Sequence, residues 1–316
     1  MARFVVTGSA GFIGSHLSAA LGSAGHEVLG LDSFTDYYSR RLKEANLGSL
    51  RLHDEFTFRE ADLADAELGA MFDGASGVFH LAAQPGVRGS WGETFEVYVR
   101  DNILATQRVF EAAAGAGIRV VFASSSSIYG DAEQHPTPED VRPRPISPYG
   151  VTKLSCEHLA RAYTHAFDLD VIGLRYFTVY GPRQRPDMAF TRIATALYAG
   201  RPFRVFGTGE QSRDFTYVSD AVSATIAAME RGVAGEMYNV GGGTEAALRD
   251  VIALCERISG RRLEVVHERA MAGDVRRTAA DTSRIRRDVQ WSPRTNLEDG
   301  LRAHLDWAQH FATEAA

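Results

Sequence analysis

Tyr149 and Lys153 are the residues whose types and spacing point most directly to chemistry. On a helix, a separation of four residues places both side chains on the same face. A free tyrosine, with a pKa of about 10, is a poor base at neutral pH, but a nearby ammonium favours its phenolate form. The pair therefore predicts proton transfer from an alcohol or sugar hydroxyl, coupled to hydride transfer if an oxidised nicotinamide lies beside it.

Lysine is so rare in this chain that its position carries information. Of the 34 basic residues only Lys43 and Lys153 are lysines, whereas 11 residues are tyrosines. Chance alone would give about 0.07 Tyr–Lys pairs at this spacing. The alternative, an ordinary surface contact between successive helical turns, is therefore disfavoured.

A run of four serines, Ser124 to Ser127, follows an apolar stretch that is typical of a strand. A serine run alone usually indicates a flexible loop. Because this run ends a buried strand, we expect one of its hydroxyls, that of Ser125, to hydrogen-bond the reacting oxygen beside Tyr149.

A glycine-rich segment near the start of the chain predicts a dinucleotide site. Gly8, Gly11 and Gly14 join the first expected strand to a helix that begins at Phe12 and Ile13. Glycines let the backbone turn sharply and approach a pyrophosphate, which then lies at the N-terminus of the helix. The alternative is a tight turn without a ligand.

The ends of the next strands supply the other expected cofactor contacts. Asp32 and Ser33 end the second strand, where a carboxylate accepts hydrogen bonds from an adenosine ribose and repels the extra phosphate of NADP. We therefore predict NAD. The remaining expected contacts follow the third and fourth strands and are Asp62, Leu63, Leu81, Ala82 and Ala83. His80 precedes them and is interpreted as a structural residue at a strand end.

Alternating short apolar runs and helical patterns position these residues and predict a Rossmann-type, doubly wound parallel α/β sheet. The expected strands are 4–7, 27–32, 56–59, 77–81, 119–123 and 171–176, and the expected helices are 12–24, 95–114 and 149–167. We expect residues 1–177 to form the NAD-binding domain, with a return of about 215–240. Residues 178–316 form a smaller C-terminal substrate-binding domain.

Composition excludes several classes of protein. The net charge of −6 and the pI of about 5.9 argue against a nucleic-acid partner. No apolar run approaches the ~20 residues of a membrane span, and the first strand begins too early to leave room for a signal peptide. Cys156 and Cys255 form no CxxC pair. We therefore expect reduced thiols, no metal site and a cytoplasmic location.

Together these motifs resemble the extended short-chain dehydrogenase/reductase family over nearly the whole chain. Within it, three passages resemble the UDP-glucuronate 4-epimerases: 32–38, 83–88, and 175–182 running on to 185–189. The resemblance implies tightly held NAD, a UDP-sugar bound by the second domain, and a homodimer formed through two helices of each subunit.

The resemblance also assigns roles to individual residues. Ser125, Tyr149 and Lys153 match the catalytic residues. Related dehydratases carry an Asp-Glu pair where this chain has Ser126 and Ser127, and galactose-type epimerases have Asn in place of Thr178. The expected substrate contacts are Arg88, Ser125, Ser126, Ser127, Thr178, Arg185, Arg192, Val205, Arg213 and Arg276. The last two match positions that grip ribose or diphosphate.

The reaction this implies is epimerisation at C4 of a UDP-sugar through a transient 4-keto sugar. For a uronate that intermediate is a β-keto acid, which readily loses carbon dioxide. A carboxylate that must be held in place needs hydrogen-bond donors and a positive charge, which are offered by Ser126, Ser127, Thr178 and Arg185. These residues therefore favour UDP-glucuronate as substrate, with UDP-galacturonate as product. The alternatives are a UDP-glucose/UDP-galactose 4-epimerase, another nucleotide-sugar dehydratase or reductase, and an NAD-binding sensor without chemistry.

Overall fold

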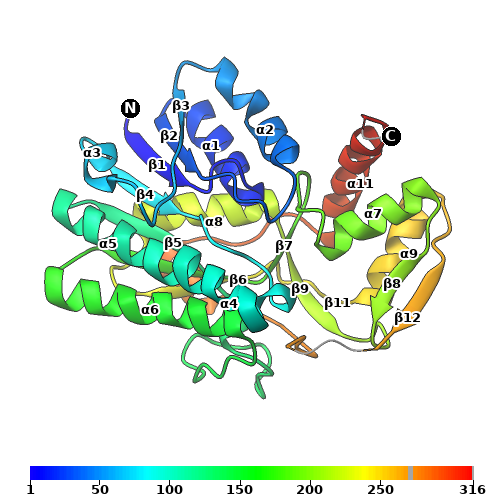
Figure 1. Cartoon of the computed structure of the whole chain (residues 1–316). Helices are drawn as coiled ribbons and strands as arrows, with labels where there is room; N and C mark the ends of the chain where they lie inside the picture. The colour runs from blue at the N-terminus through cyan, green and yellow to red at the C-terminus, as the bar shows by residue number, and fades with distance from the viewer. Residues whose placement is uncertain (270–272, 315–316) are drawn as a thin grey trace.

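A computed structural model describes residues 1–269 and 273–314 and contains one large parallel sheet. Its strand order is β10-β6-β5-β4-β1-β2-β3, with the order reversing between β1 and β4 (Figure 1). This arrangement confirms the predicted Rossmann-type doubly wound sheet. The strands are β1 (Arg3–Thr7), β2 (Glu27–Asp32), β3 (Phe56–Glu60), β4 (Gly77–His80), β5 (Arg119–Ser125), β6 (Val171–Tyr176) and β10 (Met237–Val240).

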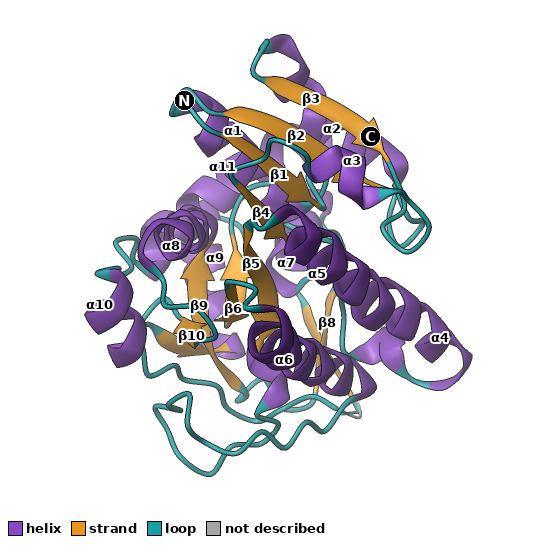
Figure 2. Ribbon diagram, turned by 90° about the vertical axis from the view of Figure 1, so that its left-hand side faces the viewer, coloured by secondary structure: helices purple, strands orange, loops and turns teal. Residues whose placement is uncertain are grey.

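Helices cover both faces of this sheet because its central strands are apolar on both sides. Val5 and Val6 are neighbours in β1 but lie in separate buried clusters, one on each face. One face is covered by α1 (Phe12–Ser23) and α8 (Val218–Arg231). The other is covered by α3 (Leu68–Phe72), α5 (Ala105–Ala116) and α6 (Pro148–Phe167), and α5 and α6 stand in front of the strands in Figure 2.

A smaller body with its own core is built from later segments. It contains a sheet of β11, β9 and β7 and a pair of β12 and β8. Tyr180, Phe190 and Phe215 pack in its buried cluster. Its elements are β7 (Thr178–Tyr180), α7 (Ala189–Ala199), β8 (Phe203–Phe206), β9 (Ser212–Tyr217), β11 (Glu245–Ala247), α9 (Leu248–Ser259), β12 (Val265–Glu268) and α11 (Leu297–Glu314).

The chain returns to the large sheet between β9 and β11. In that interval α8 packs against α1, and β10 pairs with β6 in parallel, with Asn239 opposite Arg175. The remaining elements are α2 (Arg40–Gly48), η1 (Leu50–Leu52), η2 (Arg88–Ser90), η3 (Gly92–Thr94), α4 (Phe95–Tyr98), η4 (Val99–Leu104), η5 (Ser126–Ile128) and α10 (Ser283–Val289).

The long helix predicted for residues 95–114 is wrong as a continuous α-helix. It is interrupted by η4, a π-helical turn, before α5 resumes at Ala105. The turn carries Asn102, whose buried side chain accepts a hydrogen bond from the Gln84 amide at 2.7 Å and donates to Gln84 O and Thr152 Oγ1. A local insertion of this kind aims one side chain at a chosen target. Here it ties the loop after β4 to α6.

Candidate active site

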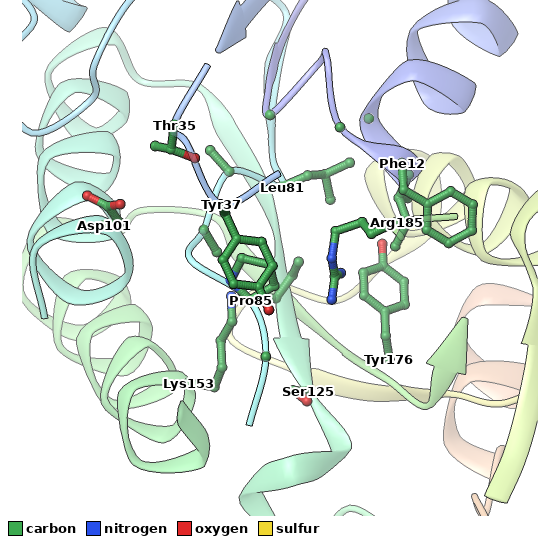
Figure 3. A pocket seen from close by; sticks show the side chains of 18 of the residues that line it. Phe12, Thr35, Tyr37, Leu81, Pro85, Asp101, Ser125, Lys153, Tyr176 and Arg185 are labelled. Carbon is green, nitrogen blue, oxygen red and sulfur yellow. Dashed lines mark hydrogen bonds between the residues drawn. The ribbon is translucent and has the colours of Figure 1, made fainter. Parts of the chain in front are cut away.

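One pocket runs along the C-terminal ends of the central strands, on both sides of the point where the strand order reverses. Such crevices are where ligands bind in open α/β sheets. Figure 3 shows Tyr37, Lys153, Tyr176 and Arg185 around it. The predicted residues that line it are Gly8, Gly11, Phe12, Ile13, Gly14, Asp32, Ser33, Asp62, Leu63, Leu81, Ala82, Ala83, Ser125, Ser126, Ser127, Tyr149, Lys153, Thr178 and Arg185.

The glycine loop leaves no room for side chains at two of its positions. Gly8 has φ of +72°, and a Cβ there would lie 2.8 Å from Ala82 N. A Cβ at Gly14 would lie 2.1 Å from Gly8 O. The first turn of α1 has no capping side chain and no acidic residue, so its amides are available to an anion. The loop therefore fits a dinucleotide pyrophosphate.

Asp32 lies at the end of β2 with its carboxylate directed by main-chain amides. It accepts hydrogen bonds from Phe34 N at 2.9 Å and Ala10 N at 3.2 Å. Burial raises the pKa of Asp32, and the Lys43 ammonium, 3.9 Å away, acts in the opposite direction. The carboxylate thus keeps lone pairs free for the hydroxyls of a ribose.

Asp62 is less free than the sequence suggested. One of its oxygens accepts a hydrogen bond from Ala64 N at 3.0 Å, and the other lies 2.8 Å from Arg100 Nη1. Its expected contact with the cofactor therefore has to share the carboxylate with Arg100, a partner that the sequence did not reveal. That contact stays a prediction.

The start of α6 brings Tyr149 against the serine loop. Ser147 caps the helix by accepting a hydrogen bond from Gly150 N at 3.1 Å, and Pro148 opens the first turn. A Cβ at Gly150 would lie 2.6 Å from Ser127 O, so the helix and the loop can approach this closely only because residue 150 is glycine. Four residues on, the buried Lys153 donates from Nζ to Ala123 O at 2.9 Å.

Ser125 is the last residue of β5 and lies opposite Tyr176, the last residue of β6. Thr178 follows Tyr176 by two residues. Its Oγ accepts a hydrogen bond from Ser127 N at 3.1 Å, which holds the turn that follows. The Tyr149 ring packs edge-on against Tyr98. The geometry therefore assembles Ser125, Tyr149 and Lys153 around the same part of the pocket.

Behind this group lies a buried ion pair between Glu157 of α6 and Arg175 of β6. Arg175 donates from Nε to one oxygen of Glu157 at 2.9 Å and from Nη2 to the other at 2.8 Å. Ser124 Oγ donates to Glu157 at 2.6 Å, and the third nitrogen of Arg175 donates to Tyr129 Oη and Glu139 O. The network links β6 to β5 and α6, the two elements that carry Ser125, Tyr149 and Lys153.

His80 does not line the pocket. Its ring nitrogens lie 2.8 Å from Thr7 Oγ1 and 3.0 Å from Thr106 Oγ1. Burial, with a smaller contribution from Lys153, lowers the pKa of His80 to about 3, so the ring is neutral. In this position it joins β1, β4 and α5 rather than moving protons.

The expected substrate contacts fall into two groups. Thr178 and Arg185 line the pocket, whereas Arg88, Arg192 and Arg213 do not line it but lie near one another. The Arg88 and Arg192 guanidiniums lie 4.3 Å and 5.6 Å from the ring of Phe206 in β8. Burial lowers the pKa of the half-buried Arg213; Asp274 and Asp131 act in the opposite direction, and the nearby Arg88 charge lowers it further. Three cations in such proximity suit a diphosphate.

Two of the expected substrate residues need correction. The Val205 side chain is 1% exposed within the core of the smaller body, because β8 directs it inward, so only its backbone can contact a ligand. The Arg276 side chain is 93% exposed and lies 3.8 Å from Asp131. The structure therefore does not bring the Arg276 guanidinium into the pocket.

Comparison with known proteins agrees with this geometry. Residues 4–241 match the model of the NAD dependent epimerase/dehydratase family. This chain belongs to that family. It is 43% identical to an uncharacterised UDP-glucose epimerase, YtcB, of Bacillus subtilis, with 95% of each chain covered. It is 36% identical to UDP-glucuronate 4-epimerase of Thermodesulfobacterium geofontis, with 98% and 97% covered.

A solved structure of the same family has nearly the same backbone. UDP-glucuronic acid 4-epimerase from Bacillus cereus, crystallised with UDP-glucuronic acid and NAD, superimposes with a TM-score of 0.95. The two chains are 42% identical, and the match covers 98% of this chain and 99% of the other. The family and the fold expected from the sequence are therefore confirmed.

Several residues of this epimerase-family pocket were missed by sequence reasoning. Lys43 is buried, donates to Thr35 O at 2.8 Å, and lines the pocket with Tyr37 and Asp101. The available signal was its rarity, since it is one of two lysines. Tyr37 lies in the passage 32–38 that carries the resemblance but was not singled out, and Asp101 carried no comparable signal. Among the described residues, no cluster of His, Cys, Asp and Glu could hold a metal ion, and none of their helices is long and apolar enough for a bilayer.

Proposed function

We propose that this protein epimerises UDP-glucuronate at C4 to give UDP-galacturonate, with NAD as its cofactor. One observation carries the proposal. Ser126, Ser127, Thr178 and Arg185 line the same pocket as Tyr149, and the serine loop holds no acidic side chain. Hydroxyls and a guanidinium donate hydrogen bonds, and the carboxylate of a uronate needs hydrogen-bond donors because it can only accept.

The chain's own residues account for the proton movements. NAD, when bound, supplies an acceptor for the C4 hydride and returns it to the sugar. Tyr149 accepts the proton of the C4 hydroxyl, and Lys153 lies one helical turn further along α6. The Ser125 hydroxyl donates to the C4 oxygen. The 4-keto sugar then rotates and presents the other face of C4. Hydride returns to that face and Tyr149 returns the proton to the C4 oxygen, so the configuration at C4 is inverted.

The uronate imposes a second task on the site. Its 4-keto form loses carbon dioxide when the bond to the carboxylate aligns with the ketone π system. Ser126, Ser127 and Thr178 are short donors that hold the carboxylate out of that alignment, while Arg185 supplies charge. A buried carboxylate without such partners would cost several kcal/mol.

A UDP-glucose/UDP-galactose 4-epimerase is the second candidate, favoured by the 43% identity with YtcB. The test is to incubate purified protein with UDP-glucuronate and, separately, with UDP-glucose, and to resolve the products by chromatography. Each donor left unpaired by a neutral sugar costs about 1–3 kcal/mol, so two of them give UDP-glucuronate a preference of about 100-fold or more. Equal or faster turnover of UDP-glucose would refute the uronate assignment.

Two further parts of the proposal concern the domains and the cysteines. We assign NAD to residues 1–177 with the return segment, and the UDP-sugar to residues 178–316, because the Arg192, Arg213 and Phe206 side chains belong to the smaller body. Cys156 and Cys255 are both free and buried, which supports a reducing compartment and hence the cytoplasm.

We also propose a homodimer. Apolar side chains are exposed along α4, η4 and the start of α6, among them Val99, Leu104 and Val151, which are 39%, 44% and 45% exposed. A shallow groove between Trp91, Phe95 and Val151 adjoins them. Exposed apolar patches of this kind mark subunit contacts. Light scattering should give twice the chain mass, and Val151→Glu should shift it toward the monomer. A monomeric wild type would refute the dimer.

A further inference from the structure

Asp187, in the loop between β7 and α7, joins two sides of the pocket. Its Oδ1 accepts a hydrogen bond from Arg185 Nε at 3.0 Å, and its Oδ2 accepts one from Arg185 Nη2, also at 3.0 Å. The same Oδ2 accepts a hydrogen bond from Tyr37 Oη at 3.2 Å. Tyr37 belongs to the loop that follows Asp32. One carboxylate therefore ties the cofactor side of the pocket to Arg185.

This arrangement fixes the plane of the guanidinium. A bidentate pair holds both the position and the orientation of an arginine fork, whereas an untied arginine is flexible. The Arg185 side chain is 19% exposed, and its guanidinium lies 5.8 Å from the Tyr37 ring centre. Figure 3 shows it pointing into the pocket beside Tyr176. Both hydrogen bonds of the guanidinium to Asp187 use Nε and Nη2 and not Nη1.

The charges around Arg185 agree with this geometry. Burial opposes its positive charge, but Asp187, together with Tyr37 and Tyr149, outweighs burial and raises the pKa of Arg185. The titratable groups that face Arg185 are Asp187 from its own loop, Tyr37 and Tyr38 from the loop after β2, Tyr98 from α4 and Tyr149 from α6. Of these, Asp187 alone is a carboxylate. Arg185 is therefore charged and compensated before a substrate arrives.

We propose that Asp187 is a positioning residue for Arg185 and thereby sets the selectivity for a uronate over a neutral hexose. This inference rests on the proposed function. Asp187 occupies the Nε side of the fork and leaves the Nη1 side to the carboxylate at C5 of the sugar. Tyr37 holds Asp187 in turn, so the preference for a uronate depends on two residues that do not touch the reacting carbon.

The test compares Asp187→Asn with the wild-type holoenzyme. The amide keeps the size of the side chain but removes its charge and one acceptor. We expect the KM of UDP-glucuronate to rise about tenfold, the effect of one disordered charge-assisted hydrogen bond, while the inhibition constant of UDP-glucose changes by less than about twofold. Tyr37→Phe should raise the KM of UDP-glucuronate by a smaller factor.

Asp288→Asn is the matched control. Asp288 pairs with Arg287 through the same two nitrogens, at 2.7 Å and 3.2 Å, but in α10 and away from the pocket. In Asp288→Asn, the KM of UDP-glucuronate and the inhibition constant of UDP-glucose should equal those of the wild type. An unchanged or lower KM in Asp187→Asn, or an equal rise in both constants, would overturn the inference. If Asp187→Asn does not fold, Tyr37→Phe provides the test, and an unchanged KM for UDP-glucuronate in that variant would overturn the inference. A wild type that does not convert UDP-glucuronate would overturn the proposed function as well.

Discussion

Replacing Glu157 by Gln should destabilise the protein far more than the same change at an exposed pair of identical geometry. In the folded protein both members of the Glu157–Arg175 pair are 7% exposed. Gln keeps the shape of Glu157 and one acceptor but loses the charge, which leaves the Arg175 guanidinium buried with only neutral partners. Breaking a buried pair on one side costs about 3–5 kcal/mol. Since the amide keeps part of the hydrogen bonding, we expect a loss of about 3 kcal/mol.

Glu245 provides the control. Arg277 donates to it from Nε at 2.8 Å and from Nη2 at 2.9 Å, and Ser212 donates to the same oxygen as Nε does, so the contacts reproduce those of Glu157 with Arg175 and Ser124. The difference is exposure, which is 51% for Arg277 and 28% for Glu245. An exposed pair contributes about 0–1 kcal/mol, so Glu245→Gln should cost no more than that.

The measurement is urea denaturation of both variants, followed by circular dichroism, with the free energies of unfolding compared at a common denaturant concentration. A loss below about 1 kcal/mol for Glu157→Gln, or equal losses for the two variants, would refute the view that burial makes this pair essential. Because the pair joins α6 to β6, Glu157→Gln should also lower turnover.

Three further predictions concern the site. Tyr149→Phe should retain NAD and the fold but lose most turnover, and a near-normal rate in that variant would place the base elsewhere. Lys153→Arg should also be impaired because the bulkier fork misplaces its donors, and a normal rate there would remove Lys153 from the catalytic group. Gly14→Ala should lose NAD, because the added Cβ would lie 2.1 Å from a main-chain oxygen; the NAD released from denatured protein measures this loss. Gly22→Ala in the same helix is the control, since its Cβ would have no other atom within 4 Å, and its stability should match or exceed that of the wild type. Burial raises the pKa of Asp32 above the 3.8 of an ordinary Asp, so the affinity for NAD should begin to fall at a higher pH than 3.8 would give as the pH is lowered. Calorimetry should show this fall in the wild type and not in Asp32→Asn. A wild-type affinity that does not change with pH would contradict the prediction.

The sheet and the glycine loop could be predicted from the sequence because their signals are local. The strand 171–176 begins with the apolar run Val171–Leu174, and the glycines stand at a fixed distance from the end of a strand. The π-helical turn at Asn102 could not be predicted, because its cause is a hydrogen bond to Gln84, which lies on another segment.

The substrate side was harder to predict, because its contacts join residues that are distant in sequence. Arg185 was expected to bind substrate, but Asp187, which pairs with it, is held by Tyr37 from 150 positions earlier, and nothing in the composition connects the two segments. Arg276 was assigned by motif position alone, and its side chain points to solvent, since motif matching gives no side-chain direction. The predicted substrate contact of the Val205 side chain was wrong for a similar reason, because the two-residue period of a strand decides which face of the sheet a side chain occupies.

The central claim is that hydride leaves C4 of the sugar and returns to the same carbon while Tyr149 moves the proton. The direct test is to convert UDP-glucuronate carrying deuterium at C4 and to examine the product by mass spectrometry and NMR. We predict UDP-galacturonate with deuterium retained at C4 in ordinary water and with no net consumption of added NAD. Loss of the label to solvent, or a product inverted at another carbon, would contradict the account.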